Sequence, residues 1–499
     1  MMIKKILLRI GILCLLLVAF NFIYTKWFYE KDLQQHAEII NLVREVPDDA
    51  DIIYLGESSN VTFRGSDLDK RPISAFVGDH YPHLQTYDIT KPAGHAGIYK
   101  VLLENIPPTN SVKTVVVTLN LRSFNAQWIY SELETPLQKS LVLIKHFPPL
   151  LNRFFLSFKA YDIKTKDERT RQFKRKWKRD TFHVPFELPY KNVTEWDHHM
   201  WKNGIQNEDG TKNQEMTELA CHYIKAYAFQ IDTLHNPRIK DFDAIVALAQ
   251  KRGWNLVFNL MAENTEKAKA LIGDPLLYFM EENTRLLMDY YGRKGVVVVN
   301  NLHQVADEQF IDQNWTTEHY AEKGRQTIGK NVAKAIRVWH EEDYVPVDYD
   351  QQYQTTFFND CDHHVVWGQM QTATKEEVHS GKQASRTGKG ADYSITLEYP
   401  LKLIPDSLKN QVAINLWLYQ TSLDHEASLV IQAEGEAIEY YWKGYSITSY
   451  TKETGKWVPV EVVAPIPDRI KQADLIKIYI YNPSKELIYI DDFAISFKP

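Results

Sequence analysis

A serine and a histidine of this chain lie where they could form an acyl-transfer catalyst. Ser58 follows a short apolar run, residues 51–55, and a glycine, Gly56. His319 lies just before a helical stretch that begins near Lys323. A serine hydroxyl is a weak nucleophile and needs a base to take its proton. The pair would let Ser58 attack a carbonyl carbon, with His319 acting as general base and then as general acid.

Such an attack creates an oxyanion, and three N–H groups could hold it. Asn120 follows the apolar run 114–119, so its side-chain amide could donate a hydrogen bond there. Gly94 could offer a backbone N–H close to the incoming carbonyl. The backbone N–H of Ser58 itself is the third group, if a helix begins directly after the first run.

The histidine also needs a partner that orients its ring. Glu318 is its neighbour in sequence, and Asp312 lies seven residues before it. Either carboxylate could take this role, or a main-chain carbonyl could, and the sequence does not decide between them. Arg122 is a candidate clamp for a carboxylate or phosphate of the substrate, and a surface ion pair is the alternative.

The elements that would position these residues indicate an α/β domain. Four apolar runs are short, rich in aliphatic residues and not alternating, as in strands buried on both faces of a parallel sheet. They cover residues 51–55, 114–119, 254–258 and 295–299. Helical stretches lie between or after them, at 241–251, 275–291 and 323–340. We therefore expect a doubly wound, mostly parallel sheet, with Ser58 at the carboxyl end of a strand, where such sheets bind ligands.

Taken in order, these residues resemble the SGNH or GDSL hydrolases. That family has Gly-Asp-Ser after the first strand, and Gly56-Glu57-Ser58 matches it with Glu in place of Asp. Its oxyanion blocks supply a Gly and an Asn, which Gly94 and Asn120 match. Its catalytic His lies five residues before a Gly, as His319 does before Gly324. The resemblance covers about residues 50–340 and implies an esterase or O-acyltransferase that needs no metal or organic cofactor.

Two positions depart from the family pattern. The family has an Asp three residues before its His, and this chain has Thr316 there. The family's third sequence motif, which supplies the Asn, reads Gly-x-Asn-Asp, whereas residues 119–122 read Leu-Asn-Leu-Arg. These departures leave open a non-catalytic assembly or glycan-binding protein on a degenerate SGNH scaffold.

The rest of the chain comprises an N-terminal segment, an insertion within the α/β domain, and a C-terminal region. Residues 1–29 hold an apolar run from 6 to 24, with Lys4 and Lys5 before it and Arg9 near its start. This pattern predicts an uncleaved membrane anchor with the basic end in the cytoplasm, and a cleaved signal segment is the alternative. Residues 30–344 form the α/β domain, and about 130–240 are an insertion that covers or frames its site. The basic run 169–179 within the insertion is a solvated helix face or a contact for anionic lipid or glycan.

From residue 345 to 499 the pattern alternates, as in an all-β sandwich. Residues 379–385, 455–459 and 488–493 resemble jelly-roll carbohydrate-binding, or galactose-binding-like, modules. Trp417, Tyr419, Trp442 and Trp457 are the aromatic residues that could stack on a sugar. The alternative is that they pack in the core of a purely structural or partner-binding sandwich.

The composition narrows the partners. The formal net charge of -6 is small for 499 residues, so nothing indicates nucleic acid. Three Cys give neither a disulfide framework nor metal-ligand spacing, and the adjacent pairs at 198–199 and 363–364 are poor chelating sites for their histidines. We expect an extracytoplasmic, membrane-anchored protein that acts on an envelope polysaccharide or glycolipid. The sequence does not choose between hydrolysis and acyl transfer, and it identifies neither the glycan nor any protein partner.

Overall fold

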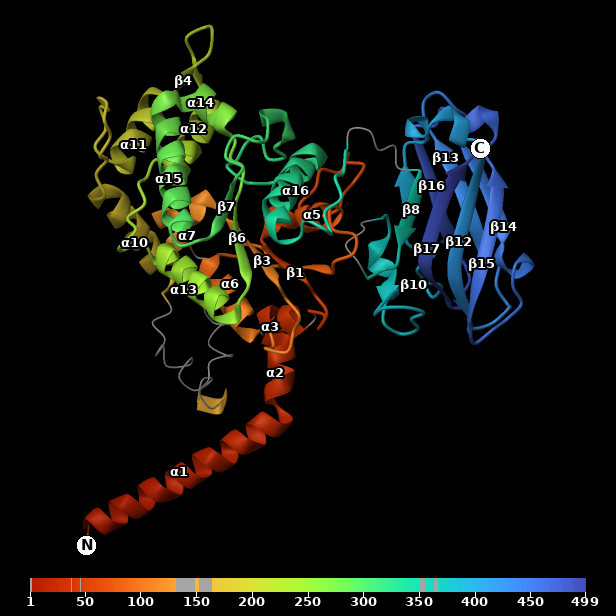
Figure 1. The fold of residues 1–499 in the computed structure, drawn as a ribbon, viewed down its shortest axis with the longest axis horizontal. Helices are drawn as coiled ribbons and strands as arrows, with labels where there is room; N and C mark the ends of the chain where they lie inside the picture. Colours follow the sequence, from red (N-terminus) through yellow and green to blue (C-terminus); the bar gives the residue numbers. More distant parts are fainter. Residues whose placement is uncertain are drawn as a thin grey trace. The chain divides into compact units, whose positions relative to one another are not determined.

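The computed structural model describes most of the chain, which divides into two compact units. The described residues are 2–36, 38–44, 46–131, 149–151, 164–349, 355–362 and 367–499. One unit holds residues 1–65 and 72–347, and the other holds residues 66–71 and 348–499 (Figure 1). The sequence predicted the change of domain near residue 345.

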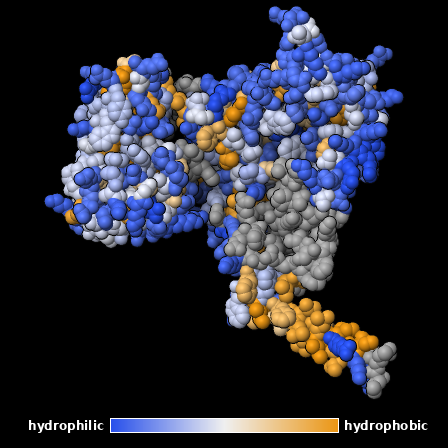
Figure 2. All heavy atoms as spheres, turned by 180° about the vertical axis from the view of Figure 1, so that it is seen from behind, coloured by the Kyte–Doolittle hydropathy of each residue, from blue (hydrophilic) through white to orange (hydrophobic). Residues whose placement is uncertain are grey.

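The N-terminal segment is one long apolar helix, α1 (Met2–Trp27), followed by α2 (Tyr29–His36) and α3 (Glu38–Arg44). Within the described residues, only the part of α1 from Lys4 to Trp27 is long and apolar enough to cross a membrane. None of its most apolar stretch is buried against the protein, and Figure 2 shows its surface as hydrophobic.

A five-stranded parallel sheet forms the centre of the first unit. Its strands are β1 (Ile52–Gly56), β2 (Thr86–Thr90), β3 (Thr114–Leu119), β6 (Asn255–Leu260) and β7 (Val297–Asn300). They are arranged in the order β2-β1-β3-β6-β7, and every pairing is parallel (Figure 1). The strand order therefore reverses between β1 and β3, and such a reversal opens a crevice at the carboxyl ends of the strands.

Helices cover both faces of this sheet, as a doubly wound arrangement requires. One face packs on α6 (Ala96–Asn105), α13 (Pro237–Arg252), α14 (Thr265–Ile272) and α15 (Asp274–Gly292). The other packs on α5 (Ile73–Gly78) and α16 (Glu322–Ile336). Successive residues of a strand point to opposite faces, so Ile53 enters the first core and Tyr54 the second. Burial on both faces explains why the sequence runs do not alternate.

Strand β2 is the one member of the sheet that the sequence analysis did not predict. Its sequence is Thr-Tyr-Asp-Ile-Thr, and only its third and fourth residues are buried. It lies at the edge of the sheet, where one side needs no apolar partner. A polar edge strand therefore lacks the continuous apolar run that identified the other four.

The expected insertion is helical where it is described. The short helix α7 (Ala126–Ile129) directly precedes it. The insertion contains α10 (Lys166–Arg179), α11 (Val193–Asn203), the short strands β4 (Ile205–Gln206) and β5 (Lys212–Asn213), and α12 (Gln214–Tyr227). Residues 132–148 and 152–163 lie outside the described residues. Trp196 and Tyr223 pack into the core under the sheet, so the insertion is part of this unit.

The second unit consists of antiparallel sheets. One has the order β15-β12-β17-β10-β9, with β8 also pairing with β17, and the other has the order β11-β16-β13-β14. The strands are β8 (Thr356–Asn359), β9 (Ala373–Thr374), β10 (Ala384–Thr387), β11 (Leu397–Tyr399), β12 (Gln411–Gln420), β13 (Ser428–Glu434), β14 (Tyr441–Ser446), β15 (Trp457–Pro465), β16 (Leu475–Tyr481) and β17 (Ile488–Lys498). Both sheets bury alternate side chains in one shared core, which makes the unit a β-sandwich.

Candidate functional site

The candidate nucleophile lies at the point where the strand order reverses. Ser58 is the first residue of the short helix α4 (Ser58–Val61), directly after β1. Gly56 permits this sharp turn, because a Cβ there would lie 2.7 Å from the Cβ of Asn60 and 2.9 Å from the hydroxyl of Thr90. As the first residue of a helix, Ser58 has a backbone N–H without an intrahelical acceptor.

Ser58, His319 and Asp312 form a continuous hydrogen-bonded chain. His319 Nε2 lies 3.0 Å from Ser58 Oγ, and His319 Nδ1 lies 2.7 Å from Asp312 Oδ2. His319 and Asp312 are partly exposed, so the site is open to solvent. This geometry fits a nucleophile, a base and a group that orients the base.

The loop before α16 explains why Asp312, seven residues away, is the partner of His319. Phe310 and Tyr320 form an antiparallel bridge, and the backbone N–H of Ile311 donates to the carbonyl of His319 at 2.9 Å. The loop thus closes on itself and brings Asp312 beside the histidine ring. The hydroxyl of Thr317 also donates to Asp312 Oδ2.

Glu318, the other candidate partner, does not orient the histidine. It points into the interior, where both of its carboxylate oxygens accept hydrogen bonds from the guanidinium of Arg122. Neighbouring residues in an extended segment point to opposite sides, which separates Glu318 from His319. Arg122 is 4% exposed, so the prediction that it clamps a substrate is wrong. The surface ion pair that was its alternative is a buried ion pair instead.

This ion pair belongs to a buried group of acidic and phenolic side chains. The hydroxyl of Tyr227 donates to Glu263 Oε2 at 2.5 Å. Burial, together with the nearby charge of Glu318, raises the pKa of Glu263 well above its usual value. Glu57, the residue before the nucleophile, is buried in the same region, and burial with repulsion from Glu318 raises its pKa to about 7.

Asn120 reaches the nucleophile segment, as an oxyanion donor must. Its Nδ2 donates to Glu57 Oε1 at 2.7 Å, and its Oδ1 has no partner among the described residues. An amide nitrogen carries two hydrogens, so one remains for a ligand. Glu57 therefore fixes the orientation of the Asn120 amide, a role that the sequence analysis did not identify.

Gly94 does not offer the N–H that the sequence analysis expected. Its backbone N–H donates to the carbonyl of Lys91 at 2.8 Å, within the turn after β2. A Cβ at this position would lie 2.8 Å from the same carbonyl and 3.0 Å from the ring of Tyr99. Gly94 is required by close packing, and the expectation that its N–H serves an oxyanion is corrected accordingly.

Ser58, His319 and Asp312 are called the triad below. The sequence analysis did not identify two residues that lie close to His319 in sequence. Trp315 lies in the loop between Asp312 and His319, is 46% exposed, and contacts the ring of His222 on α12 at 4.0 Å between centroids. Arg325 is fully buried, and its guanidinium donates to the carbonyls of Tyr320 at 2.7 Å and of Thr62 at 3.3 Å. It thus joins the histidine loop to the end of α4. Their only signal in the sequence was proximity to His319.

The histidine pairs and the basic run were the other sequence features of interest. Within the described ranges no cluster of three or more His, Cys, Asp and Glu side chains could hold a metal ion. The histidine pair at 363–364 lies outside the described residues. The basic run 169–179 is the C-terminal part of α10, where Phe173 packs on Trp177 and the Trp177 indole N–H donates to Asn125.

Three of the four candidate aromatic residues, Trp417, Tyr419 and Trp457, lie on the same sheet of the β-sandwich. Tyr419 is paired in register with Trp457 on one side and with Tyr489 on the other. Residues directly opposite in a sheet share a face, so these three rings form a row across β15, β12 and β17, here called the aromatic row. Trp417 lies under the ring of His379, stacked at 3.8 Å between centroids.

Trp442 is not part of this group. It lies on β14, an edge strand of the other sheet. The paired aspartates near the C-terminus have a structural role, because Asp491 and Asp492 accept hydrogen bonds from His379 and Ser380. They fix the loop that covers Trp417.

Comparisons with known proteins found no match among protein-family models, and no curated protein matches the chain. Solved structures that resemble part of it include carbohydrate-binding modules. The CBM22-1 xylan-binding domain of Paenibacillus barcinonensis Xyn10C is 14% identical, with 25% of this chain and 79% of that one covered and a TM-score of 0.19.

Two more neighbours are of the same kind. The C-terminal family 22 module of Clostridium thermocellum Xyn10B is 10% identical, with 31% of this chain and 97% of that one covered and a TM-score of 0.21. TmCBM61, solved with beta-1,4-galactotriose, is 12% identical, with 30% and 92% covered and a TM-score of 0.17. Similarities at this level assign no ligand to this chain.

Proposed function

We propose that the first unit is a serine-dependent esterase or O-acyltransferase for acyl esters, acetyl esters above all, of an envelope polysaccharide or glycolipid. The observation that carries the proposal is the hydrogen-bonded chain from Ser58 Oγ to His319 Nε2 at 3.0 Å and from His319 Nδ1 to Asp312 at 2.7 Å. The resemblance of the sequence to SGNH hydrolases implies the same chemistry.

In the first half-reaction Ser58 Oγ attacks the ester carbonyl carbon while His319 Nε2 takes the hydroxyl proton. The carbonyl oxygen becomes an oxyanion that the Ser58 backbone N–H and the second Asn120 amide hydrogen hold. This attack gives a tetrahedral intermediate. When it collapses, the bond between the carbonyl carbon and the sugar oxygen breaks, and the sugar oxygen receives the proton from His319. The products are an acyl-serine and a free sugar hydroxyl.

In the second half-reaction water or another sugar hydroxyl attacks the acyl-serine, and His319 takes its proton. Collapse of the second tetrahedral intermediate returns that proton to Ser58 Oγ. Water gives hydrolysis and a sugar hydroxyl gives acyl transfer. Asp312 holds the ring in the tautomer that accepts the proton at Nε2 and stabilises the imidazolium formed in each half.

Two features support a sugar-bearing substrate at a membrane. Trp315, in the loop that carries Asp312 and His319, has an exposed ring, and flat rings stack on sugar faces. The span from Lys4 to Trp27 would anchor the protein, and the basic residues before it would stay in the cytoplasm. The catalytic unit would then act on the extracytoplasmic side.

A second candidate function, glycan binding without catalysis, is favoured by the aromatic row of Trp457, Tyr419 and Tyr489. The absence of a Gly94 donor and the Thr at position 316 would fit a scaffold that has lost its reaction. In this case the sandwich alone would recognise the polymer.

Turnover of an acetyl ester reporter by the full chain in detergent separates the two candidates. The wild type should release the reporter and Ser58→Ala should not. Ser449→Ala, which changes an exposed region of the sandwich, serves as the matched control and should keep full activity. Equal turnover by wild type and Ser58→Ala would refute the role of Ser58.

A further inference from the structure

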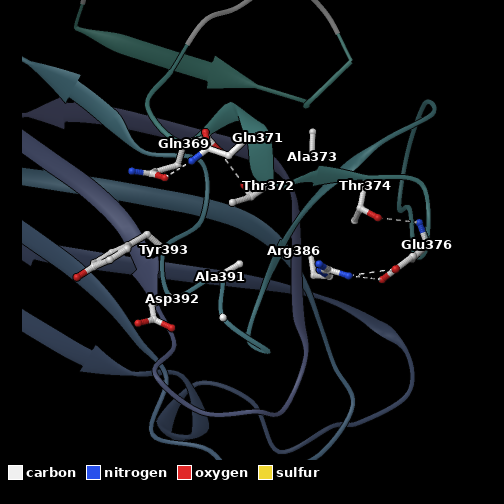
Figure 3. A pocket seen from close by; sticks show the side chains of 11 residues that line it. Gln369, Gln371, Thr372, Ala373, Thr374, Glu376, Arg386, Ala391, Asp392 and Tyr393 are labelled. Carbon is white, nitrogen blue, oxygen red and sulfur yellow. Dashed lines mark hydrogen bonds and ion pairs between the residues drawn. The ribbon is translucent and has the colours of Figure 1, made fainter.

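A polar pocket of about 530 Å³ lies at one edge of the β-sandwich. Its walls come from the segment 369–374, from Glu376 and Arg386, and from the segment 390–393. Figure 3 shows Asp392 and Tyr393 on one side of the pocket and Arg386 and Glu376 on the other. The volume is typical of sites that bind small molecules, whereas the lining is unusually polar for one.

One wall of the pocket is held in a strained, fixed conformation. Gln369 adopts φ +62°, which is uncommon for a residue other than glycine. Its side-chain oxygen accepts a hydrogen bond from the Gln371 amide at 2.5 Å, and its carbonyl accepts one from the Thr372 hydroxyl at 2.8 Å. Such strain persists where surrounding contacts maintain it, and it is frequent at binding sites. The two amides are thus presented to the pocket in a set orientation.

The charges of the lining leave one carboxylate without a partner. Arg386 pairs with both oxygens of Glu376, at 3.1 and 3.2 Å, and the hydroxyl of Tyr489 donates to Glu376 at 3.0 Å. The hydrogen bond from Tyr489, followed by that from Arg386, holds the pKa of Glu376 below its usual value. Among the described residues, no side chain pairs with the carboxylate of Asp392.

From this lining we infer that the pocket binds a neutral saccharide through its hydroxyl groups. Neighbouring hydroxyls can donate to the two oxygens of Asp392, and the remaining guanidinium N–H groups of Arg386 can donate to hydroxyl oxygens. The amides of Gln369 and Gln371 offer further polar contacts. Two lining carboxylates against one guanidinium disfavour an acidic sugar. The exposed ring of Tyr393 provides an apolar face at the rim.

This site is distinct from the aromatic row, of which Tyr419 and Trp457 were sugar-stacking candidates in the sequence. Tyr489 belongs to the row and also contacts Glu376 at the pocket wall, so the two are adjacent. The inference rests on the glycan-binding candidate and is independent of catalysis at Ser58. Ser58→Ala should therefore bind saccharide like the wild type, whichever outcome the esterase test has.

Calorimetric titration of the full chain in detergent tests the inference. The probes are neutral hexasaccharides of glucose, xylose and galactose, with a galacturonic acid hexasaccharide as the acidic counterpart. At least one neutral probe should bind, and the acidic probe should bind at least tenfold more weakly. Asp392→Asn and Arg386→Gln should each weaken binding about 10- to 100-fold, the loss expected for a charged hydrogen bond.

Matched variants locate the site. Asp424→Asn removes an exposed carboxylate elsewhere on the sandwich and should leave binding unchanged. Trp457→Ala removes the far end of the aromatic row and should weaken binding less than Asp392→Asn does. The inference is overturned if no neutral probe binds, if the acidic probe binds best, or if Trp457→Ala abolishes binding while both pocket variants keep it.

Discussion

At the scale of single residues, two neighbouring positions have opposite roles. Glu318 and His319 are adjacent, yet the glutamate is buried on Arg122 and the histidine faces Ser58. The sequence could identify Glu318 and Asp312 as candidate partners of the histidine, because both are carboxylates and both lie close to it in the chain. It could not choose Asp312, because that choice depends on how the loop from Phe310 to Tyr320 closes.

These roles predict different consequences for two similar substitutions. Asp312→Asn should lower kcat by roughly 100-fold or more with little change in Tm, since the triad acid acts on catalysis. Glu318→Gln should leave Arg122 buried without its partner charge and lower stability by about 3–5 kcal/mol. Steady-state kinetics and thermal melts of both variants measure this. The opposite pattern would make Glu318 the catalytic acid.

We predict from the raised pKa of Glu57 how the free energy of unfolding depends on pH. Its pKa is raised to about 7 in the folded protein, above that of an exposed glutamate. The folded state therefore binds its proton more tightly than the unfolded state, so this contribution to stability is complete below about pH 4.5. It is lost as the pH rises toward 7, and its full size is on the order of 3 kcal/mol.

Glu57→Gln should remove that pH dependence, because glutamine does not titrate. Chemical denaturation between pH 5 and pH 8 compares the variant with the wild type. The wild type should lose more stability than the variant over this window. Parallel curves would show that Glu57 does not carry the raised pKa.

At the level of the elements, the loop before α16 carries the candidate catalytic residues Asp312 and His319 and a candidate substrate contact, Trp315. Trp315 packs against His222 of α12, and its ring is partly exposed. Sequence patterns could predict α16 and the buried strands, since these depend on local periodicity. They could not predict β2, the polar edge strand, or the contact between Trp315 and the insertion.

If Trp315 stacks on the sugar, Trp315→Ala should raise KM for an acetylated oligosaccharide by up to about tenfold. This is the loss of affinity expected when one aromatic stacking contact is removed. KM for p-nitrophenyl acetate should not change, since that ester has no sugar. Trp201→Ala, at an exposed tryptophan of α11, is the matched control. An equal effect on both substrates would mean that Trp315 supports the loop and does not contact sugar.

At the scale of the whole molecule, the change from helical to alternating patterns near residue 345 lies close to the division after Val347. Among the residues that the structure describes, the core of the sandwich consists of residues from Phe357 onward. Composition could locate this division because the two units bury side chains with different periodicities. The positions of Asp392 and Arg386 around one pocket could not be predicted, because they follow from the turns that join the strands.

A separate core predicts that a fragment of residues 345–499 folds alone. It should be soluble, rich in β-structure by circular dichroism, and unfold in one cooperative transition. The chain without these residues should keep its activity on a small acetyl ester and lose activity on the polymer, because the local substrate concentration falls. An unfolded fragment would show that the sandwich needs the α/β unit.

The proposed catalysis requires that Ser58 is a nucleophile activated by His319. Intact-mass and peptide-mass analysis after brief exposure to a fluorophosphonate tests it without knowledge of the natural substrate. We expect one adduct, on the peptide that contains Ser58, and its loss in both Ser58→Ala and His319→Ala. An unlabelled wild type, or labelling that persists in His319→Ala, would contradict it.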